Sequence, residues 1–489
     1  MQRREFLAMA GLAGAGAPQQ PARAGKMIGI QVGAVSFVDE GVEEVLDIFE
    51  RTAHINTLFL AVFTYGRGIA GRQVPGQPLP DHGKQEYDLD FHGGNYATVH
   101  PEYYRDTGVR PEDTRAPDHG DLDIVAAVLP AARKRRMRVI LWAEDVWRDD
   151  IPGIDRLRET DLHGRLGARL CLNNPYHRNF LMGLVEDYAR SYEIDGLMWG
   201  SERQGALGNA LSASHGGAPN DAGRVGCFCS YCETKVRRQG RFEFARVREG
   251  YLRLEEMINE WLAGRRPADG RFVSFLRLLM RYPEILAWEQ FWHESLRELY
   301  QEIYRKVKSI RPEAAVGWHI WHNNSFSPLY RAQQDVRELA HCSDFLKVVM
   351  YHNVAGERMA SYIRRVAGNV FGDFAPQEAL AFHYRVMNYR EGELKTIPFT
   401  GFSADYVARE TRRALEAAAG TPLRIWPGID IDIPTEPGHS KCTPEGTKAA
   451  VRAALGAGAH GVLLSRKYSE MRLANLRAAG EAIEELGLA

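Results

Sequence analysis

Short apolar runs alternate with amphipathic stretches along the chain from about residue 26 to its C-terminal end. The runs are rich in β-branched and aromatic residues, and their apolar positions are consecutive, which is typical of strands buried on both faces. The stretches between them repeat apolar residues at helical spacing. The pattern predicts eight strands, at residues 26–37, 56–65, 138–147, 194–202, 314–323, 344–353, 422–432 and 460–470.

Eight strands that alternate with helices predict a (β/α)8 TIM barrel, because parallel strands need helical crossovers that cover the sheet. A doubly wound open sheet is the alternative, but no Gly-x-Gly-x-x-Gly follows the first strand. Two insertions interrupt the pattern: a Gly- and Pro-rich loop at 66–120 and a helical segment at 233–312. Both follow the carboxyl ends of strands, where barrels carry their active sites, so they predict substrate walls or, alternatively, structural caps.

The first 25 residues have the pattern of a twin-arginine export signal. Arg3-Arg4 precedes a short apolar stretch and small-residue cleavage sites. We expect residues 1–25 to be removed, residues 26–489 to form the barrel domain, and the protein to be periplasmic or secreted. A disordered basic tail is the alternative. No other stretch is long and apolar enough to span a bilayer.

The charge balance indicates what the protein does not bind. Lys and Arg number 62, Asp and Glu number 63, and the formal net charge is −1. This balance gives no electrostatic reason to expect a nucleic acid or an anionic membrane as partner. The sequence does not decide whether the chain forms a homo-oligomer.

Polar side chains gather at the predicted strand ends, which meet at one rim of a barrel. Carboxylates and amides bind sugar hydroxyls, so the mixture predicts a carbohydrate substrate. The expected substrate-binding residues are Glu144, Arg203, Trp199, His319, His322, Asn323, Tyr351, His352, Asp432, Arg466, Tyr468 and Glu470. The indoles expected to stack on sugar rings at this rim are those of Trp142, Trp147, Trp199, Trp318, Trp321 and Trp426.

Glycosidic cleavage needs two carboxyl groups beside the scissile bond. Glu202 is the expected general acid, since it directly follows an apolar strand where burial would raise its pKa. A salt bridge with a neighbouring arginine is the other interpretation of Glu202. Asp430 is the first choice for the second catalytic carboxylate, with Asp432 and Glu470 as further options. An aspartate at a strand end is also often a turn or helix cap.

Three of the six cysteines form a Cys-x-Cys-x-x-Cys cluster at Cys227, Cys229 and Cys232. Thiolates at this spacing can hold a tetrahedral Zn²⁺, which takes four ligands in a structural site. The fourth ligand would come from Cys171, Cys342 or Cys442. Disulfides are the alternative in an exported protein. Zinc is favoured because Cys229 and Cys232 are too close for a relaxed bridge.

The order of these motifs resembles the β-galactosidases of glycoside hydrolase family forty-two and the proteins called hypothetical glycosyl hydrolases. In both, a glutamate ends strand four and a Cys-x-Cys-x-x-Cys and a basic helix follow. The segment "CLNNPYHR" at 171–178 is similar to the family segment that adds a cysteine to the zinc site. The resemblance implies a clan-A barrel, Glu202 as acid/base, and a structural zinc on Cys171, Cys227, Cys229 and Cys232.

The sequence also departs from that family. Ser201 stands where the family has an asparagine, and strand seven carries Asp430 and Asp432 where the family has a nucleophilic glutamate. Sugar specificity and retention of configuration therefore do not carry over. Two other functions remain open: a carbohydrate-binding barrel without catalysis, and a metal-dependent hydrolase built on the histidines. The second lacks the His-x-His pair expected at the end of strand one.

Overall fold

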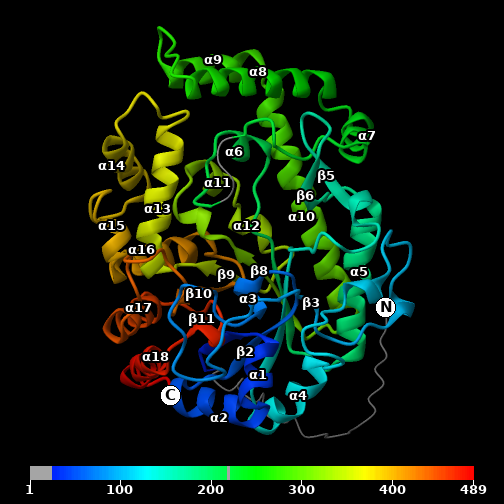
Figure 1. The fold of residues 1–489 in the computed structure, drawn as a ribbon, viewed down its shortest axis with the longest axis vertical. Helices are drawn as coiled ribbons and strands as arrows, with labels where there is room; N and C mark the ends of the chain where they lie inside the picture. The colour runs from blue at the N-terminus through cyan, green and yellow to red at the C-terminus, as the bar shows by residue number, and fades with distance from the viewer. Residues whose placement is uncertain (1–24, 217–220) are drawn as a thin grey trace, which may run out of the picture.

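The computed structural model describes residues 25–216 and 221–489 (Figure 1). Nearly all of the predicted export signal lies outside these ranges. Parallel strands pair in the order β1-β11-β10-β9-β8-β7-β4-β2, and β2 pairs with β1, which closes the sheet into a barrel. The (β/α)8 fold predicted from the sequence is confirmed. The barrel strands are β1 (Met27–Val32), β2 (Thr57–Thr64), β4 (Arg138–Glu144), β7 (Gly196–Gly200), β8 (Ala315–Ile320), β9 (Phe345–Val349), β10 (Arg424–Asp430) and β11 (Gly461–Ser465).

Each predicted strand runs beyond the observed carboxyl end. The predicted strand at 26–37 includes the start of helix α1, and the one at 344–353 includes the start of helix α13. The apolar pattern continues because these residues stay buried at the barrel mouth after the backbone has turned. Burial alone therefore does not mark where a strand ends.

Helices surround the barrel on its outside (Figure 1). Several begin with a side-chain cap or a proline in the first turn, which satisfies free N–H groups or removes one. The helices are α1 (Ala34–Glu40), α2 (Val42–Ala53), α3 (Arg67–Ala70), α4 (Ile124–Lys134), α5 (Pro175–Ser191), α6 (Ala206–Ala210), α7 (Ser230–Gln239), α8 (Phe244–Leu262), α9 (Arg271–Arg281), α10 (Glu284–Ile310), α11 (Pro328–Ala332), α12 (Val336–Leu339), α13 (His352–Ala367), α14 (Pro376–Met387), α15 (Ile397–Thr400), α16 (Ala404–Ala417), α17 (Pro444–Gly456) and α18 (Leu473–Glu485).

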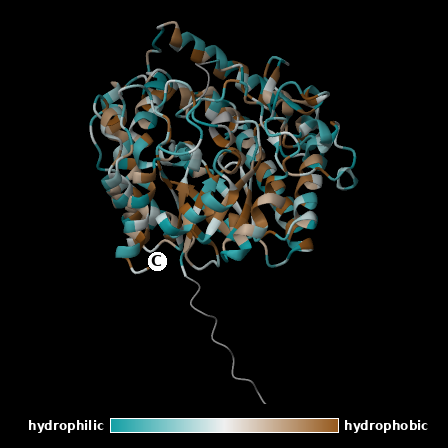
Figure 2. Cartoon of the chain, turned by 60° about the horizontal axis from the view of Figure 1, so that its bottom comes forward, coloured by the Kyte–Doolittle hydropathy of each residue, from teal (hydrophilic) through white to brown (hydrophobic). Residues whose placement is uncertain are grey.

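The barrel interior is apolar at its amino-terminal end and polar at its carboxyl end. Large side chains fill the apolar part, among them Phe59, Trp142, Met198, Phe345 and Trp426. Figure 2 shows hydrophobic residues gathered in the central strands, while hydrophilic residues dominate the periphery. The next inward-facing positions are polar, and this change of chemistry marks the functional end of the barrel.

The segment after β2 is largely irregular, but β3 (Gly94–Asn95) pairs antiparallel with β2. After β7 come α7 to α10, and α10 packs beside α5 as the barrel helix of that unit. A hairpin of β5 (Arg158–Thr160) and β6 (Leu166–Leu170) follows β4. No helix within the described ranges is long and apolar enough to cross a membrane.

Candidate active site

Glu202 is a strand-end carboxylate that solvent reaches. It follows β7 by two residues, and its side chain is 44% exposed, whereas that of His319 beside it is 4% exposed. Its Oε1 lies 3.0 Å from Nε2 of His319, which belongs to β8. Glu202 thus offers a free face to a ligand while its other side is held by the barrel.

His319 is held at its second nitrogen by Lys347 of β9. The Nζ of Lys347 lies 3.2 Å from Nδ1 of His319, and an ammonium group can only donate. Nδ1 therefore accepts, so the ring proton is on Nε2 and is donated to Glu202. Burial and the charge of Lys347 lower the pKa of His319 to about 4, which keeps the ring neutral near pH 7.

Lys347 is a fully buried cation in the middle of a barrel strand. Its Nζ also donates to Oε1 of Gln31 at 2.9 Å and to the hydroxyl of Tyr351 at 2.7 Å. Gly428 makes room for it, since a Cβ at that position would lie 2.7 Å from Cε of Lys347. Burial lowers the pKa of Lys347 to about 7, although nearby carboxylates oppose this shift. With the contact to His319, all three donors of the ammonium are used.

The pKa of Glu202 is shifted in the direction opposite to our expectation. Burial favours its neutral form, but the hydrogen bond from His319 and the positive charge of Arg358 outweigh burial and lower the pKa to about 2. The sequence predicted a raised pKa because Glu202 follows an apolar strand. That prediction was wrong, because the cations around the carboxylate come from distant parts of the chain. Glu202 is therefore ionised near neutral pH.

Glu144, the last residue of β4, has the opposite protonation. It is 5% exposed, and its carboxyl packs against Gly200, where a Cβ would lie 2.5 Å from either oxygen. Burial and the charge of Glu202 raise its pKa to about 8, despite the opposing charge of Lys347 and a hydrogen bond from Trp142. Two interacting carboxyls whose pKa values diverge in this way are suited to acid and base roles.

Asp430 serves as a helix cap in the structure. It is fully buried, and its carboxylate accepts the backbone N–H groups of Asn353 at 3.3 Å and Val354 at 3.1 Å. Both belong to the first turn of α13, where a negative charge is stabilising. Its Oδ1 also lies 2.7 Å from Nδ1 of His352. The geometry therefore favours the capping alternative over our prediction of a catalytic carboxylate.

The two other candidate carboxylates are also engaged. Asp432 accepts the backbone N–H of Arg472 and the side-chain amide of Asn475, each at 2.8 Å, at the start of α18. Its second oxygen receives the guanidinium of Arg472. Glu470 is buried and paired with Arg466, whose Nε lies 3.2 Å from Oε2. Both carboxylates are thus occupied by protein groups, which does not suit either of them to the role of second catalytic carboxylate.

Several predicted contact residues form the buried wall of the mouth. The Nε2 of His322 lies 3.0 Å from the hydroxyl of Tyr406. The hydroxyl of Tyr468 donates to Glu40 on the far side of the β11 loop. Asn323 is fully buried, and its amide donates to a backbone carbonyl at 2.9 Å. These side chains bond to other protein groups and form the wall behind the site, whereas the sequence predicted that they contact the ligand.

The six tryptophans predicted to stack on sugars are all buried, with exposed fractions of 9% or less. Trp142 and Trp426 fill the barrel interior. Trp318 stacks on Tyr300 of α10 at 4.0 Å between ring centroids. Trp199 belongs to the core between the strands and the helices. The expected aromatic platform is wrong for the four tryptophans within strands, since alternate strand positions point them into the two cores. Trp147 and Trp321 follow the ends of β4 and β8 and are buried there.

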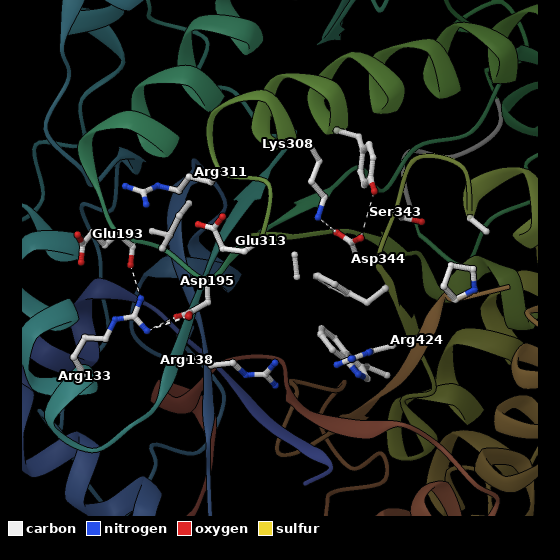
Figure 3. Close-up of a pocket in the computed structure, with 17 residues that line it drawn as sticks. Arg133, Arg138, Glu193, Asp195, Lys308, Arg311, Glu313, Ser343, Asp344 and Arg424 are labelled. Atoms are coloured by element: carbon white, nitrogen blue, oxygen red, sulfur yellow. Dashed lines mark hydrogen bonds and ion pairs between the residues drawn. The ribbon is translucent and has the colours of Figure 1, made fainter. Parts of the chain in front are cut away.

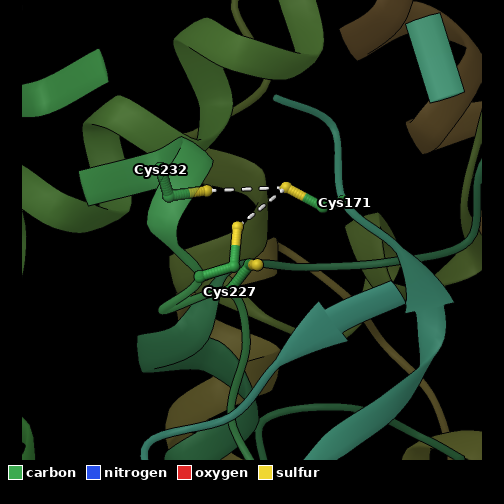
Figure 4. A group of neighbouring side chains, drawn as sticks. Cys171, Cys227 and Cys232 are labelled. Atoms are coloured by element: carbon green, nitrogen blue, oxygen red, sulfur yellow. Dashed lines mark hydrogen bonds between the residues drawn. The ribbon is translucent and has the colours of Figure 1, made fainter. Parts of the chain in front are cut away.

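A compact sulfur cluster joins the β6 hairpin to the start of α7 (Figure 4). The Sγ atoms of Cys171, Cys227, Cys229 and Cys232 all lie within 4.8 Å of one another, and the thiols are free. Cys171 is 3.5 Å from Cys229 and 3.6 Å from Cys232. Four thiolates that converge in this way fit a tetrahedral Zn²⁺ with Zn–S distances of about 2.3 Å. Among the described residues, this is the only such group of metal ligands.

The cysteine cluster is linked to the Glu202 segment through Arg203. Arg203 donates to the carbonyl of Leu170, the residue before Cys171, at 3.0 Å and pairs with Asp145 at 2.8 Å. Glu159 of β5 forms a second ion pair with it. Arg203 is thus buried and connects the β5–β6 hairpin to the barrel. This structural role differs from the predicted role in substrate binding.

Two residues of the site, Lys347 and Arg358, were not predicted from the sequence. A lysine within the apolar run "DFLKVVMYHN" is a signal of a functional or paired cation, since lysine is rarely buried. Arg358 carries no comparable signal, because its place beside His322, 3.0 Å away, follows only from how α13 docks on the barrel.

Comparison with known proteins shows a shared fold. No family model and no curated protein matches the sequence. The solved β-galactosidase of the Antarctic haloarchaeon Halorubrum lacusprofundi matches with a TM-score of 0.50 and 12% identity, over 94% of this chain and 58% of that chain. The α-L-fucosidase isoenzyme 2 of Paenibacillus thiaminolyticus matches with a TM-score of 0.48 and 12% identity, over 94% and 49%. The chain thus spans about half the length of these solved chains. It shares its (β/α)8 barrel fold with the solved β-galactosidase of Halorubrum lacusprofundi.

Proposed function

We propose that the protein is a glycoside hydrolase that cleaves an O-glycosidic bond, with Glu202 as the ionised carboxylate and Glu144 as the proton donor. The observation that carries the proposal is that two carboxyls in different settings share one barrel mouth: Glu202 is open to solvent and accepts from His319, whereas Glu144 is buried against Gly200. These settings shift their pKa values in opposite directions. The other candidate carboxylates are already bound within the protein: Asp430 and Asp432 accept N–H groups at helix starts, and Glu470 pairs with Arg466. The barrel shared with a solved β-galactosidase and the sequence resemblance to family forty-two also support it.

The two carboxyls divide the reaction between them. Glu144 gives its proton to the glycosidic oxygen as the bond from that oxygen to the anomeric carbon breaks. Glu202 either bonds to the anomeric carbon or takes a proton from the water that does so. The hydrogen bond from His319, itself fixed by Lys347, keeps the carboxylate of Glu202 ionised and oriented throughout. The two routes differ in the configuration of the released sugar.

Hydrolysis of a panel of nitrophenyl glycosides and natural oligosaccharides tests the proposal. We expect release of a reducing sugar from at least one class, with its configuration read by NMR. A carbohydrate-binding barrel is the competing function. Saturable binding of an oligosaccharide without any hydrolysis, by enzyme shown to be folded, would favour that alternative.

We also propose that the cysteine cluster holds a structural zinc ion. A closed four-thiolate site leaves no position for substrate, so the ion would fix the β5–β6 hairpin and, through Arg203, the Glu202 segment. Elemental analysis should find about one zinc per chain. Cys229→Ser should lower zinc content and thermal stability together, whereas Cys342→Ser, a buried cysteine outside the cluster, should leave zinc content unchanged. A metal-free wild type would contradict this proposal.

Export through the twin-arginine route is a further part of the proposal, motivated by Arg3-Arg4. Replacing the pair with two lysines should retain the protein in the cytoplasm, as measured by fractionation of cells. Unchanged export of that variant would contradict it.

A further inference from the structure

The outer face of helix α9 is apolar and exposed to solvent. Phe272, Leu276 and Met280 recur at every fourth position, so they lie on one face of the helix, and Val273 borders that face. Their exposed fractions are 40%, 43% and 84%, and that of Val273 is 45%. Another side of α9 packs inward through Phe275, which is buried. The exposed face is therefore not the side that holds the helix in the fold.

Aromatic rings from a second segment extend this face. Phe272 stacks on Phe371 with 6.1 Å between the ring centroids. Phe371 in turn contacts Phe374 and Phe382, at 6.3 Å and 5.6 Å, and each of these two is 44% exposed. Six of the 15 large apolar side chains that are exposed in the described part of the chain thus lie together, and such a concentration is typical of a binding surface. We call them the α9 patch: Phe272, Val273, Leu276, Met280, Phe374 and Phe382.

The α9 patch lies at the outer edge of the molecule, beyond the barrel mouth. Helix α8 is bonded to the β5–β6 hairpin that follows β4, since Arg248 donates to the carbonyl of Leu162 at 3.1 Å. Helix α9 is bonded to the far end of α13, since Arg271 donates to the carbonyl of Gly368 at 2.9 Å. Figure 1 shows α8 and α9 at the top of the view, at the edge of the ribbon. The patch is thus placed where an extended surface can reach it.

The segment that carries α9 is strongly basic. Residues 263–283 contain five arginines and one acidic residue, Asp269. Three of these arginines have carboxylate partners at the surface, among them Arg277, which pairs with Asp269 at 2.5 Å. Arg281 of α9 and Arg385 of α14 are exposed, and neither forms an ion pair within the described ranges. Positive charge therefore exceeds negative charge along the border of the patch.

A cavity at the amino-terminal end of the barrel has the opposite arrangement of charge. It is lined by five basic and four acidic side chains. Arg133 pairs with Asp195 and Lys308 pairs with Asp344, each at 2.8 Å (Figure 3). The protein thus supplies charges of both signs there, and the cavity gives no reason to expect a charged ligand. The α9 patch instead combines exposed apolar side chains with an excess of one charge.

We propose that the α9 patch binds the surface of a lipid bilayer that contains anionic lipids. Its apolar side chains would enter the boundary between headgroups and acyl chains, and the bordering arginines would meet lipid phosphates. A second copy of this chain suits the patch less well, because self-association would bring two excesses of positive charge together. The formal charge of the whole chain, −1, predicted no such partner because it averages over all surfaces. The site does not depend on the proposed glycosidase chemistry.

Co-sedimentation of the full chain with lipid vesicles tests the proposal without any glycoside. The two probes are vesicles of phosphatidylcholine alone and vesicles in which about one-third of the lipid is phosphatidylglycerol. We expect binding to the anionic vesicles to be tighter by about tenfold or more, and to weaken as added salt screens the arginines. Absent binding, or equal binding to the two kinds of vesicle, would overturn the proposal.

Variants at exposed positions separate the patch from the rest of the surface. L276S/M280S should weaken binding to anionic vesicles by about tenfold or more, because two apolar side chains no longer enter the bilayer. R281Q/R385Q should weaken the same binding by about tenfold through lost charge. V38S/L486S removes two exposed apolar side chains elsewhere and should bind like wild type. Residues 1–25 are the same in every variant, so binding by them would not produce these differences.

Two results would overturn the proposal at this stage. The first is undiminished vesicle binding by L276S/M280S. The second is a wild-type dimer that L276S/M280S dissociates, which would assign the face to a second copy of the chain. Analytical ultracentrifugation of both proteins measures this, and we expect them to have the same sedimentation coefficient.

Discussion

The two halves of the barrel mouth use the same residue types for different purposes. On the half formed by β4, β7, β8 and β9, Glu202 faces solvent and Glu144 holds a proton. On the half formed by β10 and β11, Asp430 and Asp432 receive backbone N–H groups at the starts of α13 and α18. Both halves place carboxylates at strand ends, but only one leaves a carboxylate open.

The difference lies in what meets each carboxylate. A helix N-terminus supplies fixed N–H donors and a positive partial charge. Such donors occupy both oxygens of Asp430, and at Asp432 they are joined by the guanidinium of Arg472. Glu202 instead meets one imidazole, and that contact leaves its second oxygen free for a ligand. For Glu202, Asp430 and Asp432, the chemical role therefore depends on whether a helix begins directly beside the carboxylate.

Glu202→Gln tests the half of the mouth that has the open carboxylate, and it should cause the greatest loss of activity. The amide keeps the shape but cannot attack or serve as a base, so we expect kcat/KM to fall by about 10²–10⁴-fold. Because the step needs the carboxylate whatever the leaving group, nitrophenyl and natural glycosides should lose activity alike. Glu436→Gln, an exposed acid on the other half, is the control. Parent rates in Glu202→Gln would remove the proposed role.

Glu144→Gln sharpens the assignment of the proton donor. We expect a loss of about 10²–10³-fold on natural oligosaccharides, because the leaving oxygen then receives no proton. Nitrophenyl glycosides, whose leaving groups need little protonation, should lose much less. Steady-state kinetics on both substrate classes measure the contrast. Equal losses on the two classes would argue that Glu144 is not the acid.

Asp430→Asn tests the opposite half and should act on stability. Hydrogen bonds to a charged group contribute about 1.5–3 kcal/mol, so we expect the free energy of unfolding to fall by about 1–3 kcal/mol. Activity per folded molecule should stay within a few-fold of wild type. Urea unfolding and kinetics on the same sample give both values. If Asp430→Asn instead lost as much activity as Glu202→Gln and kept its stability, Asp430 would be one of the two catalytic carboxylates.

The pH dependence gives the smallest and most specific effect. Glu202, with a pKa of about 2, stays ionised across the working range, while Glu144 loses its proton near pH 8. Activity should therefore be flat from about pH 4 to 7 and fall toward tenfold per pH unit above about pH 8. Lys347→Met removes a cation that lowers the pKa of Glu144, so the alkaline limb should move to higher pH.

Lys441→Met is the matched control for that shift, since Lys441 is an exposed lysine on the other half of the mouth. Its pH profile should overlay that of wild type. An alkaline limb that stays in place in Lys347→Met would show that Lys347 does not act on Glu144, whatever the loss in overall rate.

The sequence predicted the barrel well because buried parallel strands leave a continuous apolar signal, repeated here in every unit. It also placed Cys171 beside the cluster of Cys227, through a family resemblance. The roles of Asp430 and Glu202 were harder to predict. Whether Asp430 meets a helix N-terminus, and whether Glu202 meets Arg358, depends on docking angles that adjacent residues do not encode.

The hydrogen bond between Lys347 and Gln31 joins residues 316 positions apart in the chain. Such a contact forms only after the first strand and the sixth have met across a nearly complete sheet, and distant contacts are the slowest to form. Helices, which depend on near neighbours, form much earlier. Catalytic competence should consequently be the last property regained on refolding, lagging behind the recovery of far-ultraviolet circular dichroism, so activity serves as a reporter of barrel closure.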